Sequence, residues 1–128
     1  MLKRSKFEDD VAKKYPNLEY ESDKLTYVVP SKKRTYNPDW KIRDKVYIET
    51  KGKLDRDTIE KMLLVKAQNP DVTIYIMFQK GNNKLRRGSK TTYLDWAKKN
   101  GFIAACWQQT KGTIPPEWFE TENNNKDD

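Results

Sequence analysis

The sequence predicts a mixed α/β fold, an α+β arrangement in which one mixed β-sheet is flanked by helices. Segments with helical spacing of apolar residues alternate along the chain with short runs of β-branched and aromatic residues. At 128 residues the chain suits one domain and is too short for two ordinary ones. We therefore expect a single domain over residues 1–128, ordered from about 5 to 120, with a polar tail at 121–128.

The expected elements are a helix at 5–15, strands at 25–29, 39–43 and 45–51, a helix at 55–69, a strand at 72–78, a helix from 91 or 92 to 100, and a strand at 102–107. Ser5 and Glu8 have capping-box spacing, which starts the first helix. Residues 39–51 read as a hairpin, and residues 31–35 as a basic connector. The run VTIYIMF is the most apolar strand, so we expect it to be central.

Charge indicates the class of partner. The chain has 26 Lys and Arg against 19 Asp and Glu, which gives a net charge of +7. This excess favours a polyanionic partner, and the lack of an evident basic amphipathic helix favours nucleic acid over a membrane. No apolar run approaches a membrane span, and the N-terminus lacks a signal peptide's apolar stretch, so a cytoplasmic protein is expected.

The chain contains no histidine, which excludes several kinds of site at once. His-ligated metals and the Ser–His and Cys–His catalytic pairs are impossible without this residue. One cysteine cannot form an intramolecular disulfide. A metal in this protein would be held by oxygen ligands, which suits Mg²⁺, Mn²⁺ or Ca²⁺.

Two carboxylates and a lysine are expected to converge at one edge of the sheet. Side chains alternate along a strand, so Glu49 and Lys51 share a face, and Asp39 begins the partner strand of the hairpin. Close carboxylates repel unless a cation lies between them, and the backbone carbonyl of Thr50 is a further candidate ligand. With Lys51 beside a metal-bound water, the set suits phosphodiester hydrolysis.

A structural explanation of the same residues stays open. Asp39 after a proline is a common turn former, and Glu49 and Lys51 make an ordinary surface pair at a strand end. Glu8 is explained by its capping-box spacing alone. The four tryptophans are better explained as core or interface residues than as platforms for base stacking.

Seven longer segments, in order and rough spacing, resemble the phage endonuclease I family of Holliday-junction resolvases. They are SKFEDDV, EYES, TYVVP, TYNPDW, YIETKG, NKLRRGSKTTY and IPPEWF, and they extend from about residue 5 to 119. The PDW and YIETKG segments also resemble the PD-(D/E)xK nuclease signature. The resemblance implies a restriction-endonuclease-like core and a Mg²⁺-dependent enzyme, with Mn²⁺ as a substitute, that resolves four-way junctions and other branched DNA.

The resemblance also implies site residues and a dimer. Glu8, Asp39, Glu49 and Lys51 match the family's active-site residues, and Glu19 matches a further glutamate that matters for activity. Glu8 would then complete a second metal position. The family forms a domain-swapped homodimer whose composite active sites combine Glu8 of one chain with the remaining residues of the other, and residues 25–36 match the bridge. If a phage encodes the protein, it would act in the host-cell cytoplasm without an organic cofactor.

DNA contacts are expected from three basic segments, mainly to phosphates, with little reading of bases. The candidate residues are Lys3, Arg4, Lys6, Lys32, Lys33, Arg34, Lys80, Lys84, Arg86, Arg87 and Lys90. For residues 79–90 the alternative is a solvated loop. Three other functions stay open: a nuclease of ordinary duplex DNA, a non-catalytic DNA-binding module, and a basic structural protein.

Overall fold

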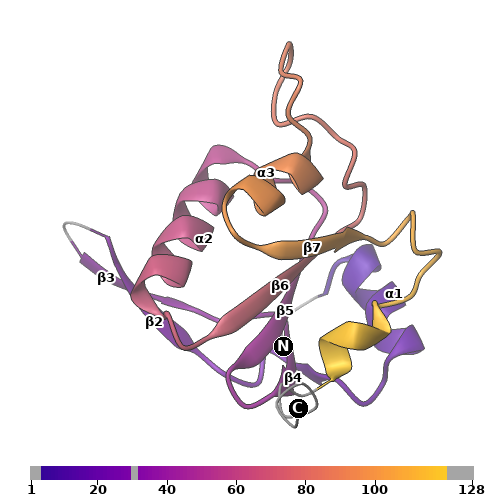
Figure 1. The fold of residues 1–128 in the computed structure, drawn as a ribbon. Helices are drawn as coiled ribbons and strands as arrows, with labels where there is room; N and C mark the ends of the chain where they lie inside the picture. The colour runs from indigo at the N-terminus through magenta and orange to yellow at the C-terminus, as the bar shows by residue number, and fades with distance from the viewer. Residues whose placement is uncertain (1–3, 30–31, 121–128) are drawn as a thin grey trace, which may run out of the picture.

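The computed structural model describes residues 4–29 and 32–120, except for the side chains of Lys32 and Lys33 (Figure 1). Its centre is a five-stranded sheet in the order β1-β4-β5-β6-β7. The strands are β1 (Glu19–Tyr20), β4 (Trp40–Arg43), β5 (Val46–Lys51), β6 (Thr73–Phe78) and β7 (Ile103–Cys106). The β1–β4 and β4–β5 pairs are antiparallel, whereas β5–β6 and β6–β7 are parallel. The mixed sheet of the sequence prediction is therefore confirmed.

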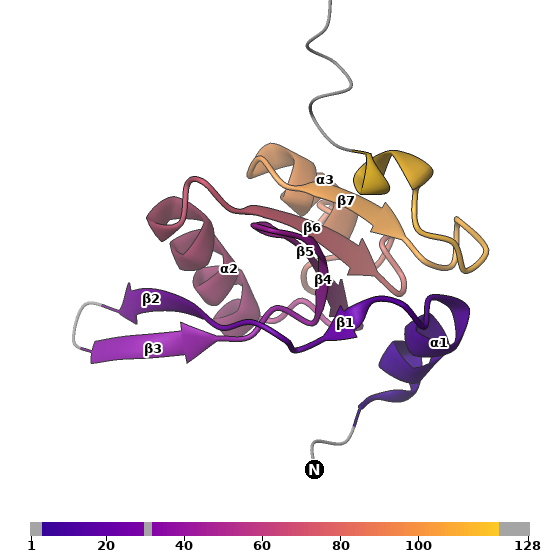
Figure 2. The ribbon, with the colours of Figure 1, turned by 90° about the horizontal axis from the view of Figure 1, so that it is seen from below.

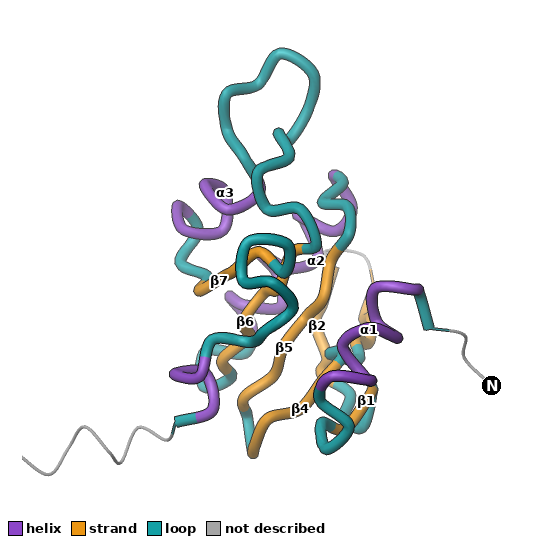
Figure 3. The backbone as a smooth tube through the Cα atoms, turned by 90° about the vertical axis from the view of Figure 1, so that its right-hand side faces the viewer, coloured by secondary structure: helices purple, strands orange, loops and turns teal. Residues whose placement is uncertain are grey.

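Helices cover both faces of this sheet (Figures 1 and 3). They are α1 (Lys6–Lys14), α2 (Arg56–Gln68), α3 (Tyr93–Lys99) and a short 3₁₀ helix, η1 (Pro116–Phe119). Because neighbouring parallel strands need a crossover, α2 connects β5 to β6 and α3 connects β6 to β7. The two crossover helices lie on one face, and α1 and η1 lie on the other.

Alternation along the strands divides the apolar interior into two clusters. Ile76 and Phe78 of β6 point toward α2 and α3, where Met62 and Val65 meet them. On the opposite face Ile48 and Met77 pack against Phe7, Val11, Trp40 and Trp118. The register pairs Glu49 with Ile76 and Thr50 with Met77, so Glu49 points toward the α2 side and Thr50 toward the α1 side.

The segment predicted as a basic connector is instead a strand, and that prediction was wrong. β3 (Lys32–Tyr36) pairs antiparallel with β2 (Leu25–Val29) in a two-stranded sheet beside α2 (Figure 2). The outer edge of β2 is covered by Gln68, which accepts from the Val28 N–H at 2.6 Å and donates to the Val28 carbonyl at 2.9 Å. The charged sequence KKRT lacks the apolar alternation typical of a strand, and the polar cover comes from a residue far away in the chain, so the local sequence did not indicate a strand.

The other predicted elements agree with the structure to within a few residues, whereas the short elements β1 and η1 were not predicted. Ser5 and Glu8 form the predicted capping box of α1, and Thr92 and Asp95 form one at α3. The predicted hairpin of β4 and β5 is confirmed, with Lys45 at a positive φ of 64° in its turn. β6 is an interior strand next to the middle strand, β5. None of the described helices has the length and apolar character that a membrane crossing needs.

Candidate active site

The hairpin register places Asp39 beside the end of β5. Trp40 pairs with Ile48, so Asp39, which precedes β4, lies next to Glu49 and Thr50. The backbone N–H of Asp39 donates to Oε1 of Glu49 at 3.4 Å. Oδ2 of Asp39 accepts from the N–H of Thr50 at 2.9 Å and from its hydroxyl at 2.7 Å. These bonds hold both carboxylates in fixed orientations, as the sequence predicted for their position.

Glu49 is surrounded by donors and cations on the α2 side. Its Oε2 lies 3.5 Å from Nζ of Lys51, and its Oε1 accepts a hydrogen bond from the hydroxyl of Tyr36 on β3. Nζ of Lys61, from α2, lies 4.9 Å from the centroid of the Tyr36 ring. Lys51, Tyr36 and Lys61 together give Glu49 a positively polarised environment.

Both carboxylates are deeply buried, and burial shifts their pKa values. Asp39 is 8% exposed and Glu49 is 3% exposed. Burial, followed by the charge of Glu49, raises the pKa of Asp39 to about 8, against the lowering effect of the two Thr50 bonds. Burial also raises the pKa of Glu49, opposed by Lys51, by the Tyr36 bond and by Lys61. Burial and Glu49 raise the pKa of Tyr36, so its hydroxyl stays protonated and remains a donor.

These two carboxylates fit a hard divalent cation. Mg²⁺ is commonly held by one or two carboxylates and keeps several waters. Burial, followed by the charge of Glu49, raises the pKa of Asp39, so a cation bound beside this carboxylate would favour its charged form. Among residues 4–29 and 32–120, no three carboxylates converge in a group that could hold a metal ion. The candidate metal ligands that the fold of one chain brings together are thus the two carboxylates of Asp39 and Glu49.

Glu8 does not join this pair within the chain. It lies on α1, which covers the face of the sheet opposite to the Glu49 side chain. Its Oε1 accepts from the Ser5 N–H at 3.0 Å and from the Tyr20 hydroxyl at 3.1 Å. Its charge still reaches Asp39, whose pKa it raises slightly after the larger effects of burial and Glu49. The capping role of Glu8 is thus confirmed, whereas its catalytic role stays a prediction.

Comparison with known proteins now identifies the family. Residues 3–127 match the model of the family described as phage endonuclease I. The chain is 36% identical over 121 residues to Endonuclease I of Escherichia phage T7, covering 91% of this chain and 78% of that protein. This chain belongs to the phage endonuclease I family. It is also 32% identical over 134 residues to Endodeoxyribonuclease 1 of Enterobacteria phage T3, covering 96% of this chain and 88% of that protein.

The basic residues expected to bind DNA in this endonuclease I family member lie in separate places. Arg34 is exposed on β3, and Lys6 is exposed at the start of α1. Arg4 is engaged locally, since its Nε lies 3.1 Å from a carboxylate oxygen of Asp9. An exposed loop that projects beyond α3 carries Lys80, Lys84, Arg86, Arg87 and Lys90 (Figure 3). Lys3 and the side chains of Lys32 and Lys33 lie outside the described part.

Glu19 is placed apart from the carboxylate pair. It is exposed on the edge strand β1, where it pairs with Lys41 of β4. The structure gives it no contact with Asp39 or Glu49 among the interactions of the described residues. Its role in this family member stays a prediction.

Sequence reasoning missed Tyr36 and Lys61, the residues that support Glu49 from the α2 side. Tyr36 lies 13 residues from Glu49, at the end of the strand β3 that the sequence did not indicate, so local spacing could not reveal their contact. Lys61 had a readable signal. It falls on the inward stripe of α2, between Thr58 and Val65, where a charged residue is unusual unless it has a partner.

Proposed function

We propose that this protein is a metal-dependent, structure-selective DNA endonuclease that resolves four-way junctions and other branched DNA by phosphodiester hydrolysis. The observation that carries the proposal is the buried Asp39–Glu49 pair with Lys51 beside it, in a chain that belongs to the phage endonuclease I family. The relatives' names, Endonuclease I and Endodeoxyribonuclease 1, support hydrolysis of DNA.

The site residues have distinct parts in this chemistry. Asp39 and Glu49 would hold Mg²⁺, or Mn²⁺ in its place, with the Thr50 carbonyl as a further ligand. The bound ion would neutralise phosphate charge and lower the pKa of an attacking water. Thr50 orients Asp39 through two hydrogen bonds, and Tyr36 orients Glu49. Lys51, held 3.5 Å from Glu49, donates to the attacking water or to the phosphate oxygens as charge develops.

A homodimer suits this substrate, because two sites related by a twofold axis can cut two opposed strands of a symmetric junction. We infer that the bridge comprises residues 25–36 and that Glu8 of one chain completes the site of the other. The charge of Glu8 reaches Asp39, which supports Glu8 as the further carboxylate of the site. In such a dimer, Glu8 would supply the third carboxylate and a second metal position.

The test compares the wild type with Asp39→Asn and Glu49→Gln on a labelled four-way junction and a matching linear duplex, with and without Mg²⁺. We expect paired cuts near the branch that require Mg²⁺ and disappear in both variants, while junction binding persists. If the wild type cut the duplex as well as the junction, the proposed junction selectivity would be wrong, and the proposed nuclease activity would stand. A wild type that binds the junction but cuts nothing under Mg²⁺ or Mn²⁺ would make the carboxylates structural.

A further inference from the structure

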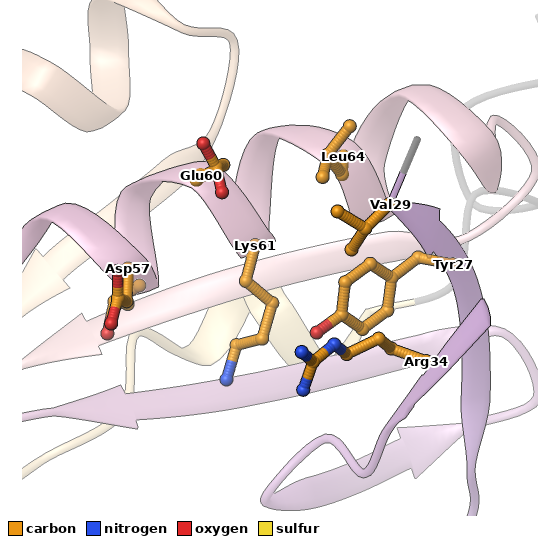
Figure 4. A pocket seen from close by; sticks show the side chains of 8 residues that line it. Tyr27, Val29, Arg34, Asp57, Glu60, Lys61 and Leu64 are labelled. Atoms are coloured by element: carbon orange, nitrogen blue, oxygen red, sulfur yellow. The ribbon is translucent and has the colours of Figure 1, made fainter. Parts of the chain in front are cut away.

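A groove of about 330 Å³ lies between the β2–β3 hairpin and α2 (Figure 4). One wall carries Tyr27 and Arg34, which are paired across the two strands of the hairpin. The other wall is α2, which contributes Lys61 and Leu64. The groove is open to solvent and mostly polar, so it suits a hydrated, charged ligand better than an apolar one.

Two cations line this groove. The side chain of Arg34 extends toward that of Lys61, and its guanidinium lies beside the Tyr27 ring (Figure 4). Two carboxylates also line the groove, but Glu60 points away from the cations and Asp57 lies toward the other end of the α2 wall (Figure 4). Among the described residues, neither Lys61 nor Arg34 is in an ion pair. Their charges are therefore available to an anion.

One aromatic ring links this groove to the candidate active site. Nζ of Lys61 lies 4.9 Å from the centroid of Tyr36, and the hydroxyl of that ring donates to Glu49. A cation over an aromatic face is attracted by the ring electrons, which helps to hold the ammonium in place. An anion bound at Lys61 would thus lie next to the carboxylate pair at a fixed position.

We propose that this groove binds one backbone phosphate of the DNA substrate, adjacent to the phosphate that is cleaved. Lys61 supplies a fixed point charge, and Arg34 supplies a planar guanidinium that can bind phosphate oxygens in a bidentate manner. A phosphate held there would set the position of the DNA strand relative to Glu49. The inference rests on the proposed function, because it takes DNA as the substrate of the neighbouring site.

The test measures binding of a four-way junction in Ca²⁺, at several salt concentrations, by the wild type and by Lys61→Gln, Arg34→Gln and the double variant. Losing one phosphate contact should reduce the slope of log K against log salt by about 0.9. We expect this in the double variant, with binding about tenfold weaker, as for the loss of a charge-assisted hydrogen bond. Smaller changes are expected in each single variant.

Lys66→Gln is the matched control. Lys66 lies on the same helix and also stacks on a ring, with Nζ 5.1 Å from the centroid of Phe102, but it lines a different cavity. This variant should keep the wild-type affinity and the wild-type slope of log K against log salt. It therefore controls both for the loss of a surface charge and for the loss of a lysine stacked on a ring. Thermal unfolding of each variant checks the fold.

A scan with single uncharged methylphosphonates along one strand locates the contact. At one position near the cut, the substitution should weaken binding of the wild type and of Lys66→Gln, but not of the double variant. A double variant with the wild-type salt slope and scan profile would overturn the inference, and the proposed function would stand if the wild type still cut the junction. A wild type that neither bound nor cut DNA would overturn both.

Discussion

At the scale of single residues, the pair of Asp39 and Glu49 combines a structural cost with a functional use. Both carboxylates are buried, and burial disfavours their charged forms. A sheet interior this close to Ile48 and Met77 would be more stable with neutral side chains. A divalent cation bound as proposed would offset this cost, and this leads to a stability prediction.

Asp39→Asn should stabilise the metal-free protein at high pH. The pKa of Asp39 is raised from 3.8, its value in an unfolded chain, to about 8 in the fold. The protonated side chain therefore contributes its full stability below pH 3.8, and this contribution is lost as the pH rises through about 8. Asparagine carries no charge in this range. At about pH 8 we expect the Tm of the variant to exceed that of the wild type by several degrees, since 1 kcal/mol corresponds to roughly 4 °C.

Thermal unfolding in EDTA at about pH 5 and about pH 8 is the measurement. The Tm difference should be clearly smaller at the lower pH, which lies close to the unfolded-state pKa of 3.8, so that little of the cost of ionising Asp39 has developed there. Mg²⁺ should then raise the Tm of the wild type and leave the variant nearly unchanged, because a ligand that binds only the folded state stabilises it. A constant Tm difference at both pH values would contradict the electrostatic explanation.

Tyr36→Phe should weaken metal binding while the fold is retained. The variant removes the hydroxyl that donates to Oε1 of Glu49 and leaves the ring in its buried position. Hydrogen-bond partners of metal ligands typically contribute 10–100-fold to metal affinity or activity, so we expect a loss of about that size. The measurement is Mn²⁺ affinity by calorimetry, together with the Mg²⁺ concentration that gives half-maximal cleavage.

Tyr27→Phe is the control for this variant, because Tyr27 belongs to the same apolar cluster and is also buried. It should keep the wild-type Mn²⁺ affinity. If the Tyr36 and Tyr27 variants lost affinity equally, the hydroxyl of Tyr36 would have no special part in holding Glu49.

At the scale of elements, helix α1 has a glutamate with two candidate roles. Ser5→Ala removes the acceptor of the capping bond at 3.1 Å, whereas Glu8→Gln keeps an oxygen that can accept from the Ser5 N–H. We expect Ser5→Ala to lose about 1 kcal/mol of stability and to cleave junctions normally. Glu8→Gln should lose little stability and most of its cleavage activity.

Urea unfolding and junction cleavage, measured on both variants, separate the roles. Activity that followed stability in the two variants would leave Glu8 as a cap alone. The separation matters because capping spacing explains Glu8 locally, and only the family resemblance pointed to catalysis.

Sequence patterns were informative where a single element or one hairpin decides the geometry. The turn of the β4–β5 hairpin and the alternation of its strands placed Asp39, Glu49 and Lys51 together correctly. β3 was missed although it pairs with the adjacent strand β2, because its residues are mostly charged and the cover from Gln68 comes from a distant helix. Tyr36 and Lys61 were missed because each reaches Glu49 from a different part of the chain.

At the scale of the whole molecule, the net charge favours a polyanionic partner, and the proposed twofold dimer would present two equivalent sites to it. The net charge of +7 would double in that dimer, and the exposed loop that carries Arg86 and Arg87 projects away from the sheet (Figure 1). Phosphate contacts of this kind give steep salt dependence and little sequence preference. Selectivity would then come from the fixed distance and direction between the two sites, so the way those sites are assembled decides what is cut.

Mixing Glu8→Gln with Asp39→Asn tests whether each site is shared between chains. If Glu8 of one chain completes the site of its partner, a mixed dimer has one site with both defects and one intact site. After joint refolding, the mixture should nick one strand of a junction, although each variant alone is inactive. Half of the dimers formed at random should be mixed, so nicking should approach about a quarter of the wild-type rate per site. If each chain used its own Glu8, both sites of every mixed dimer would carry one defect, and the mixture would stay inactive.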